Sequence, residues 1–207
     1  MNINDVENVP QVEDKLIAII NKQKELMSKY QQIEGMPNYP MDIDSKESQK
    51  WFKDFFWRII EEIMEAYECI SHKEHFEEEI GDAFHFLIEA LILINTNLDF
   101  KIDSHEDSSD MLDELFMATL EYDENVDPIK PLWEVCYRLG LAANCLKNKP
   151  WKCSQMLTDK NKFNSCMNEV LLAFISMCKF FNMNADDLYN TYWKKSEVNK
   201  FRIRSNY

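Results

Sequence analysis

Residues 58–89 read RIIEEIMEAYECISHKEHFEEEIGDAFHFLIE and hold the two acidic clusters around which we interpret the chain. The clusters are Glu61, Glu62 and Glu65, and then Glu78, Glu79 and Asp82. Residues three or four positions apart share a helix face, so the last two acids of each cluster point the same way. Most flanking positions are apolar. The pattern predicts two amphipathic helices, which a short polar link at residues 71–74 would make antiparallel neighbours.

Two acidic faces that meet inside a helical bundle need a counter-ion, because burying unpaired like charges costs several kcal/mol each. Oxygen-only ligands suit Mg²⁺ or Mn²⁺. Glutamate runs are also common on solvated helix faces, so one such motif is weak on its own. The second cluster favours a metal site. Cys69, His72 and His75 are near one another in sequence, but zinc is the weaker explanation because no second ligand pair with finger-like spacing follows.

The composition fits one all-α domain of 207 residues, with 45% hydrophobic residues and only 3 Gly and 6 Pro. So few turn residues argue against a sheet-rich chain, and no Gly-rich phosphate loop is present. The net charge of −14 argues against a nucleic-acid partner, because the phosphate backbone would repel an acidic surface. No signal peptide and no apolar run of membrane-spanning length is visible, and the 6 Cys form no CxxC pair. We therefore expect a cytoplasmic protein with reduced thiols and no membrane contact.

Helical periodicity predicts a multi-helix bundle after a loose N-terminal segment at residues 1–11. The expected helices are 12–33, 45–70, 74–94, 111–120, 129–148, 163–181 and 186–200, with a polar loop at 95–110 and a break at 149–152. The aromatic row that begins at Trp51 is assigned to the core. Gln23 is the one amide on the apolar stripe of the first helix, so it is either an edge position or a ligand contact. His85 follows Asp82 by three residues, and a core role and a site role are both open.

The last sixteen residues, YWKKSEVNKFRIRSNY (192–207), form a basic cluster in an acidic protein. Lys195, Asn199 and Arg202 fall on one helical face, and Arg204 and Tyr207 follow. One interpretation is favourable charge at a helix C-terminus, worth under about 1 kcal/mol each. The other is a C-terminal phosphate-binding arm, in which Lys and Arg donate to phosphate oxygens and the arm closes over the metal site.

Taken together, these motifs resemble a family. Glu62-x-x-Glu65 followed by Glu79-x-x-Asp82 is similar to the metal-binding signature of the all-α NTP pyrophosphohydrolases, the MazG-like superfamily. Asp82-x-x-His85-Phe86 and the ordered set of Lys195, Asn199, Arg202 and Tyr207 resemble the dimeric dUTPases of phages, some bacteria and trypanosomatids, and the stripe at Gln23 resembles their first motif. The resemblance runs in order from about residue 16 to 207.

The resemblance implies a homodimeric, all-α enzyme that hydrolyses dUTP to dUMP and pyrophosphate. It implies that Glu62, Glu65, Glu79 and Asp82 ligate two or three Mg²⁺ ions, with Mn²⁺ as an alternative, and that Glu62, or else Glu61, acts on the attacking water. It also implies substrate contacts from Gln23, Lys73, His85, Phe86, Lys195, Asn199, Arg202, Arg204 and Tyr207.

The chain departs from the family pattern where a Trp-rich segment usually follows the first acidic pair, because residues 68–76 read ECISHKEHF. Met27, Ser196 and Asn206 also replace residues usual in the family. These changes affect the expected base specificity more than the expected binding of metal and triphosphate. The alternative hypothesis is therefore a pyrophosphohydrolase that acts on dCTP or other nucleotides. A helical interaction protein, with partner surfaces at 95–110 and 147–162, is the alternative from another class.

Overall fold

The structure, a computed structural model, describes residues 1–34, 37–95, 110–123 and 125–205, and within these ranges it is all-helical. A short 3-10 helix, η1 (Ile3–Asp5), precedes the α-helices. These are α1 (Lys15–Glu34), α2 (Lys46–Glu68), α3 (Lys73–Ile94), α4 (Met111–Ala118), α5 (Ile129–Cys145), α6 (Lys160–Phe180) and α7 (Ala185–Arg204). The predicted all-α class is confirmed, and no single described helix is long and apolar enough to span a bilayer.

The observed helices begin and end close to the predicted positions, because capping residues define them. The Ser45 side chain accepts a hydrogen bond from the backbone N–H of Ser48 at the start of α2. Asp159 caps α6 in the same way, so this helix begins three residues earlier than predicted. Asn184 opens α7 with a capping box to Asp187. Of the predicted polar loop at 95–110, residues 96–109 lie outside the described residues.

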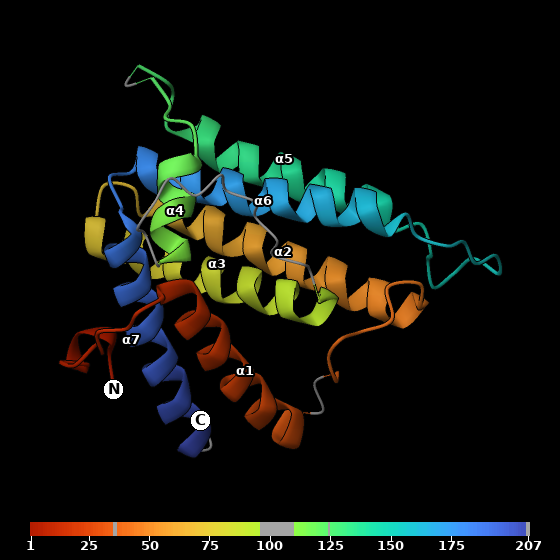
Figure 1. Cartoon of the computed structure of the whole chain (residues 1–207), viewed down its shortest axis with the longest axis horizontal. Helices are drawn as coiled ribbons and strands as arrows, with labels where there is room; N and C mark the ends of the chain where they lie inside the picture. The colour runs from red at the N-terminus through yellow and green to blue at the C-terminus, as the bar shows by residue number, and fades with distance from the viewer. Residues whose placement is uncertain (35–36, 96–109, 124, 206–207) are drawn as a thin grey trace.

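Two antiparallel helix pairs form the body of the molecule. Figure 1 shows α2 beside α3 and α5 beside α6, with α1 and α7 leaning across one end of the α2–α3 pair. The axes of α6 and α7 differ by 105° across the short turn that joins them. This bend carries the last helix back over α3, which brings the C-terminal basic residues toward the acidic clusters.

Helix α3 is the central element, because it contacts α2, α7, α1 and α6. Its Ile80, Phe84 and Leu87 side chains are fully buried. The Phe84 ring stacks on Phe174 of α6, with the centroids 5.3 Å apart. Burying an aromatic side chain of this kind contributes roughly 1.5–3 kcal/mol. The acids of α3 are therefore held on a helix whose other faces are fixed by packing.

The N-terminal segment that the sequence predicts to be loose contains η1, which lies against α7. Val6 is 8% exposed. The Tyr189 hydroxyl of α7 donates a hydrogen bond to the carbonyl oxygen of Pro10 at 3.1 Å. These contacts tie the segment to the last helix.

Candidate active site

Three carboxylates from two helices converge at one point. Glu62 and Glu65 of α2 and Glu79 of α3 each offer one oxygen, and these oxygens lie within 4.8 Å of one another. We call these three residues the acid triad. The antiparallel pairing of α2 and α3 brings the two i, i+3 motifs together. In the described part of the chain this is the one group of at least three metal-ligating side chains, and it consists entirely of the hard oxygen donors that Mg²⁺ and Mn²⁺ prefer.

Electrostatics at the triad favour a bound cation. Burial raises the pKa of Glu62 to about 7, and the nearby charges of Asp82, Glu65 and Glu79 add to the shift. Burial also raises the pKa of Glu79, followed by the charge of Asp82. A group with a pKa near 7 is half protonated at neutral pH. A divalent ion would relieve the repulsion that raises these values.

The fourth predicted ligand, Asp82, has a partner from α7. Lys195 Nζ lies 2.6 Å from Oδ2 of Asp82 and 2.8 Å from Oε1 of Glu78. Burial raises the pKa of the Asp82 carboxyl, although Lys195 opposes that shift. Burial acts to lower the pKa of Lys195, but the two carboxylates raise it overall. The structure thus pairs a predicted metal ligand with a predicted phosphate ligand, at the edge of the triad.

A cavity of about 430 Å³ opens beside the triad and is lined by α1, α2, α3 and α7. Seven of the residues predicted from the sequence line it: Gln23, Glu62, Asp82, His85, Phe86, Asn199 and Arg202. Six further lining residues were not predicted as site residues: Leu26, Tyr30, Trp51, Phe55, Arg58 and Glu89. A cavity lined by both aromatic and polar residues suits a nucleotide.

The unpredicted residues follow the helical repeat outward from the predicted ones. Trp51, Phe55 and Arg58 precede Glu62 by eleven, seven and four positions, so all lie on its face of α2. Glu89 follows Asp82 by seven positions on α3. The Phe55 and Phe86 ring centroids are 6.2 Å apart, and the Arg58 guanidinium lies 5.6 Å from the Phe86 ring. This spacing was the signal in the sequence that could have identified them.

Buried polar side chains from three helices meet at the wall of the cavity. The Tyr192 hydroxyl of α7 donates to Oε1 of Gln23 at 2.6 Å. His85 Nδ1 lies 3.0 Å from the same oxygen, and its Nε2 lies 3.1 Å from the Tyr192 carbonyl oxygen. Burial lowers the pKa of His85 to about 3. The imidazole is therefore neutral, and its one N–H can donate to the Gln23 oxygen or to the Tyr192 carbonyl oxygen but not to both.

Four predicted site residues lie away from these contacts or outside the described residues. The exposed Glu61 accepts a hydrogen bond from Trp57 Nε1 at 2.7 Å. The Lys73 side chain is 76% exposed, with Nζ 3.4 Å from Oε1 of Glu77. Arg204 is exposed in the last turn of α7. Tyr207 lies outside the described residues, so its predicted role stays a prediction.

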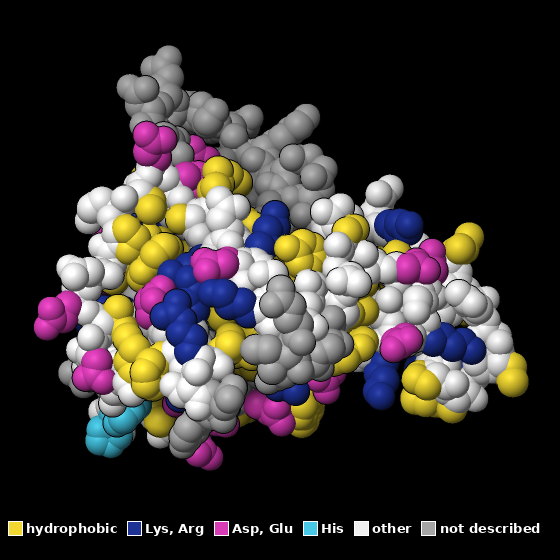
Figure 2. Space-filling view, turned by 90° about the horizontal axis from the view of Figure 1, so that it is seen from below, with side chains coloured by type: hydrophobic (Ala, Val, Ile, Leu, Met, Phe, Trp, Pro, Cys, Tyr) yellow, Lys and Arg dark blue, Asp and Glu magenta, His cyan; other side chains and the backbone are white. Residues whose placement is uncertain are grey.

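Ion pairs hold α7 against α1 along the face shown in Figure 2, where basic and acidic side chains gather together. Lys22 pairs with Glu197, and Lys200 Nζ lies 2.9 Å from Oε2 of Glu25. Lys22 also lies over the Trp193 ring, 3.8 Å from its centroid. These pairs join the helix of Gln23 to the helix of Tyr192, and so they support the polar contacts at the wall of the cavity.

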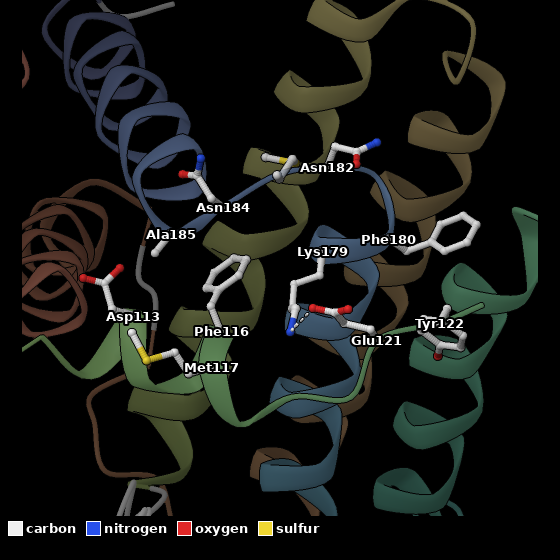
Figure 3. Close-up of a pocket in the computed structure, with 11 residues that line it drawn as sticks. Asp113, Phe116, Met117, Glu121, Tyr122, Lys179, Phe180, Asn182, Asn184 and Ala185 are labelled. Atoms are coloured by element: carbon white, nitrogen blue, oxygen red, sulfur yellow. Dashed lines mark ion pairs between the residues drawn. The ribbon is translucent and has the colours of Figure 1, made fainter. Parts of the chain in front are cut away.

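A larger cavity, of about 1000 Å³, lies between α4, the end of α6 and the start of α7 (Figure 3). Lys179 faces it, with Nζ 3.4 Å from Oε1 of Glu121 and 3.0 Å from the Thr119 carbonyl oxygen. None of the acid triad lines it. The smaller cavity is therefore the candidate active site.

Comparison with known proteins agrees with this geometry. A family model described as dUTPase matches residues 15–207 of the chain. The matched region contains every helix from α1 to α7, and so it contains the acid triad and the cavity beside it. No curated protein and no solved structure matches the chain.

Proposed function

Since the chain belongs to the dUTPase family and is a dUTP-hydrolysing enzyme, we propose that it cleaves dUTP to dUMP and pyrophosphate in a Mg²⁺-dependent reaction. The observation that carries this proposal is the convergence of Glu62, Glu65 and Glu79 beside a cavity of nucleotide size. The same three side chains that repel one another here would bind a cation together.

We propose two or three Mg²⁺ ions, with Mn²⁺ as a substitute, held by the acid triad and by Asp82. When bound, these ions would neutralise phosphate charge and make water a better nucleophile at neutral pH. For Asp82 to join the ligands, Lys195 has to leave its carboxylate or share it. Lys195 would then be free to donate to a phosphate oxygen instead.

Glu62 is our choice for the residue that orients the attacking water and takes its proton. Its pKa of about 7 is close to the value that suits a general base at neutral pH. It lies on the cavity side of α2, whereas the neighbouring Glu61 is exposed and bonded to Trp57. Glu61 remains the alternative, and the test below separates the two.

The rest of the cavity suggests how the substrate lies. Asn199 and Arg202 of α7 line it near Asp82, where they would contact phosphates. Gln23 of α1 and His85 and Phe86 of α3 also line it, and they would contact the base. Trp51 and Phe55 provide the aromatic surface that the segment after the first acidic pair lacks. We keep Lys73, Arg204 and Tyr207 as proposed outer contacts that a closing arm would bring in.

We also propose a homodimer in the cytoplasm. Large aromatic side chains are exposed on α2 and α5, with Trp57 at 60%, Trp133 at 65% and Tyr137 at 51%. Such exposure is typical of a surface that a partner covers. All six cysteines are free thiols, as expected in a reducing compartment. Sedimentation that finds only monomer would contradict the dimer.

The decisive experiment measures pyrophosphate release from dUTP, dCTP, dTTP and dATP, in Mg²⁺ and in EDTA. We expect Mg²⁺-dependent release that is far faster from dUTP. Glu62→Gln should abolish it, whereas Glu68→Gln, an exposed change at the end of the same helix, should not. If Glu61→Gln is the variant that loses turnover, Glu61 takes the role of the base.

Other outcomes would replace the proposal. Equal or faster release from dCTP would keep the metal site and assign another nucleotide as substrate. No release from any nucleotide, with the helical circular dichroism signal intact, would favour the helical interaction protein instead.

A further inference from the structure

Tyr192 is fully buried and lies behind the wall of the candidate active site, against His85 and Gln23. Its ring stacks on His85, with the centroids 4.0 Å apart, and meets Phe84 edge-on at 6.0 Å. Its hydroxyl is 2.6 Å from Oε1 of Gln23 and 3.4 Å from the Ile19 carbonyl oxygen. Burial, and then the charge of Glu89, raises the pKa of Tyr192 well above its usual value, so the hydroxyl keeps its proton and can donate.

Glu89 contacts Gln23 from the other side and favours the same direction of the amide. The Gln23 Nε2 atom lies 3.4 Å from Oε2 of Glu89. A carboxylate only accepts hydrogen bonds, so it takes the nitrogen end of the amide. The oxygen end then faces the Tyr192 hydroxyl. Because Gln23 is 2% exposed and Glu89 is 7% exposed, neither can exchange these contacts freely for water.

This orientation places a donor and an acceptor side by side on the cavity wall. An amide nitrogen carries two N–H groups, and the Glu89 contact uses one. Gln23 can therefore donate to a ligand, and the adjacent Glu89 carboxylate can accept from it. Both residues line the same cavity as Glu62 and Asp82.

Uracil matches this pair and cytosine opposes it. Along one edge uracil has the O4 acceptor next to the N3–H donor, whereas cytosine has the N4–H₂ donor next to the N3 acceptor. Uracil would accept from Gln23 and donate to Glu89. Cytosine would set donor against donor and lone pair against lone pair, and unmatched buried polar groups are strongly rejected.

We propose that Tyr192 is a positioning residue that sets the Gln23 amide so that Gln23 and Glu89 select uracil over cytosine. The inference rests on the proposed dUTP pyrophosphatase function. It assigns the base selectivity of that site to the Tyr192 hydroxyl, which contacts Gln23 but does not line the cavity. Without the hydroxyl, the Gln23 oxygen loses its shortest hydrogen bond, and only the longer contacts to His85 and Glu89, at 3.0 and 3.4 Å, oppose rotation of the amide. A rotated amide, with its oxygen facing the cavity, accepts from the cytosine amino group.

The test compares two Tyr→Phe changes on α7. Tyr192→Phe keeps the ring on His85 and removes one oxygen, and Tyr189→Phe removes the hydroxyl that bonds the Pro10 carbonyl oxygen outside the cavity. We expect Tyr192→Phe to lower the ratio of kcat/KM for dUTP to that for dCTP by roughly 10-fold, the effect of one hydrogen bond. Tyr189→Phe should leave the ratio unchanged. A ratio equal to wild type in both variants would overturn the inference.

A second measurement separates this inference from the proposed function. The affinities for dUMP and dCMP, measured calorimetrically below the unfolding temperature of each variant, report base selectivity without turnover. We expect wild type to prefer dUMP, and Tyr192→Phe and Glu89→Gln each to reduce that preference. If dUTP is hydrolysed but the preference is unaffected by both changes, the inference fails and the function stands. If turnover is absent yet the preference changes as expected, the function fails and the inference stands.

Discussion

Gly81 of α3 lies directly against Thr191 of α7, so that a Cβ added at Gly81 would come 2.7 Å from Thr191 Cγ2. The glycine permits this close approach of the two helices because it has no side chain. Asp82 is the next residue on α3, and Lys195 is one helical turn beyond Thr191. The missing side chain at Gly81 therefore lets Lys195 reach Asp82 at 2.6 Å.

Gly81→Ala should destabilise the protein and reduce turnover. An alanine in a helix interior normally adds about 1 kcal/mol relative to glycine. Here overpacking against a β-branched side chain should cost about 1–3 kcal/mol, so the net effect is a loss. Moving α7 outward would also displace Lys195, Asn199 and Arg202 from the cavity. Thermal unfolding and kcat/KM for dUTP measure the two effects.

Two variants test this explanation. Gly140 of α5 has no neighbour within 4 Å of an added Cβ, so Gly140→Ala should gain stability by about 0.5–1 kcal/mol. Thr191→Ser removes the opposing methyl group and should restore most of the loss in Gly81→Ala. If Gly81→Ala gained as much stability as Gly140→Ala, α7 would move aside without a loss of stability, and this explanation would be wrong.

Glu62 should destabilise the metal-free protein as the pH rises from about 4.5 to about 7, whereas His85, whose pKa falls from 6.5 to about 3 on folding, acts in the opposite direction below pH 6.5. The pKa of Glu62 rises from 4.5 to about 7 on folding, so in this range the folded chain holds a proton that the unfolded chain has lost. Its stabilising effect is complete at lower pH and disappears through the folded pKa. The Glu62 effect is therefore measured as the unfolding temperature of wild type minus that of Glu62→Gln, both in EDTA, and this difference should fall as the pH rises through the range. Mg²⁺ should restore stability at the upper end, because it binds the ionised carboxylates.

Lys195→Gln should lower stability by roughly 3 kcal/mol, the lower end of the range for breaking a buried ion pair. The Lys195 side chain is 7% exposed and Asp82 20% exposed, so the carboxylate would lose its cation in a poorly solvated place. Adding Asp82→Asn should recover part of the loss. Denaturant unfolding of the two single variants and the double variant gives the coupling energy. Equal losses in the single and double variants would show that Asp82 does not need the cation.

The sequence predicts the acid triad well because carboxylates at i, i+3 spacing occur twice across a short link, and helical geometry alone brings them to one point. It predicts the all-α fold for the same reason, since apolar positions repeat with the helical period through most of the chain. Trp51 shows the limit of this reasoning. Its place in an aromatic row indicates core, yet α2 extends past the core edge and leaves Trp51 on the cavity wall.

The sequence also does not determine which side chains of distant helices contact one another. Lys195 and Asp82 are 113 residues apart, and only the bend between α6 and α7 decides that they meet. The same bend brings Tyr192 to Gln23 and His85. A buried tyrosine in an apolar helix looks like packing until the partner of its hydroxyl is known.

Trp51 should report substrate binding through its fluorescence. It is partly exposed at the cavity wall, 6.3 Å from the Phe55 ring centroid, so a bound base can replace the water around it. Adding dUMP should therefore change the emission, although the other four Trp also contribute to the signal. Trp51→Phe should remove the change and weaken binding several-fold, whereas Trp133→Phe on the outer face of α5 should keep both. If the change persists in Trp51→Phe, the base binds elsewhere in the cavity, and the aromatic surface on α2 serves packing.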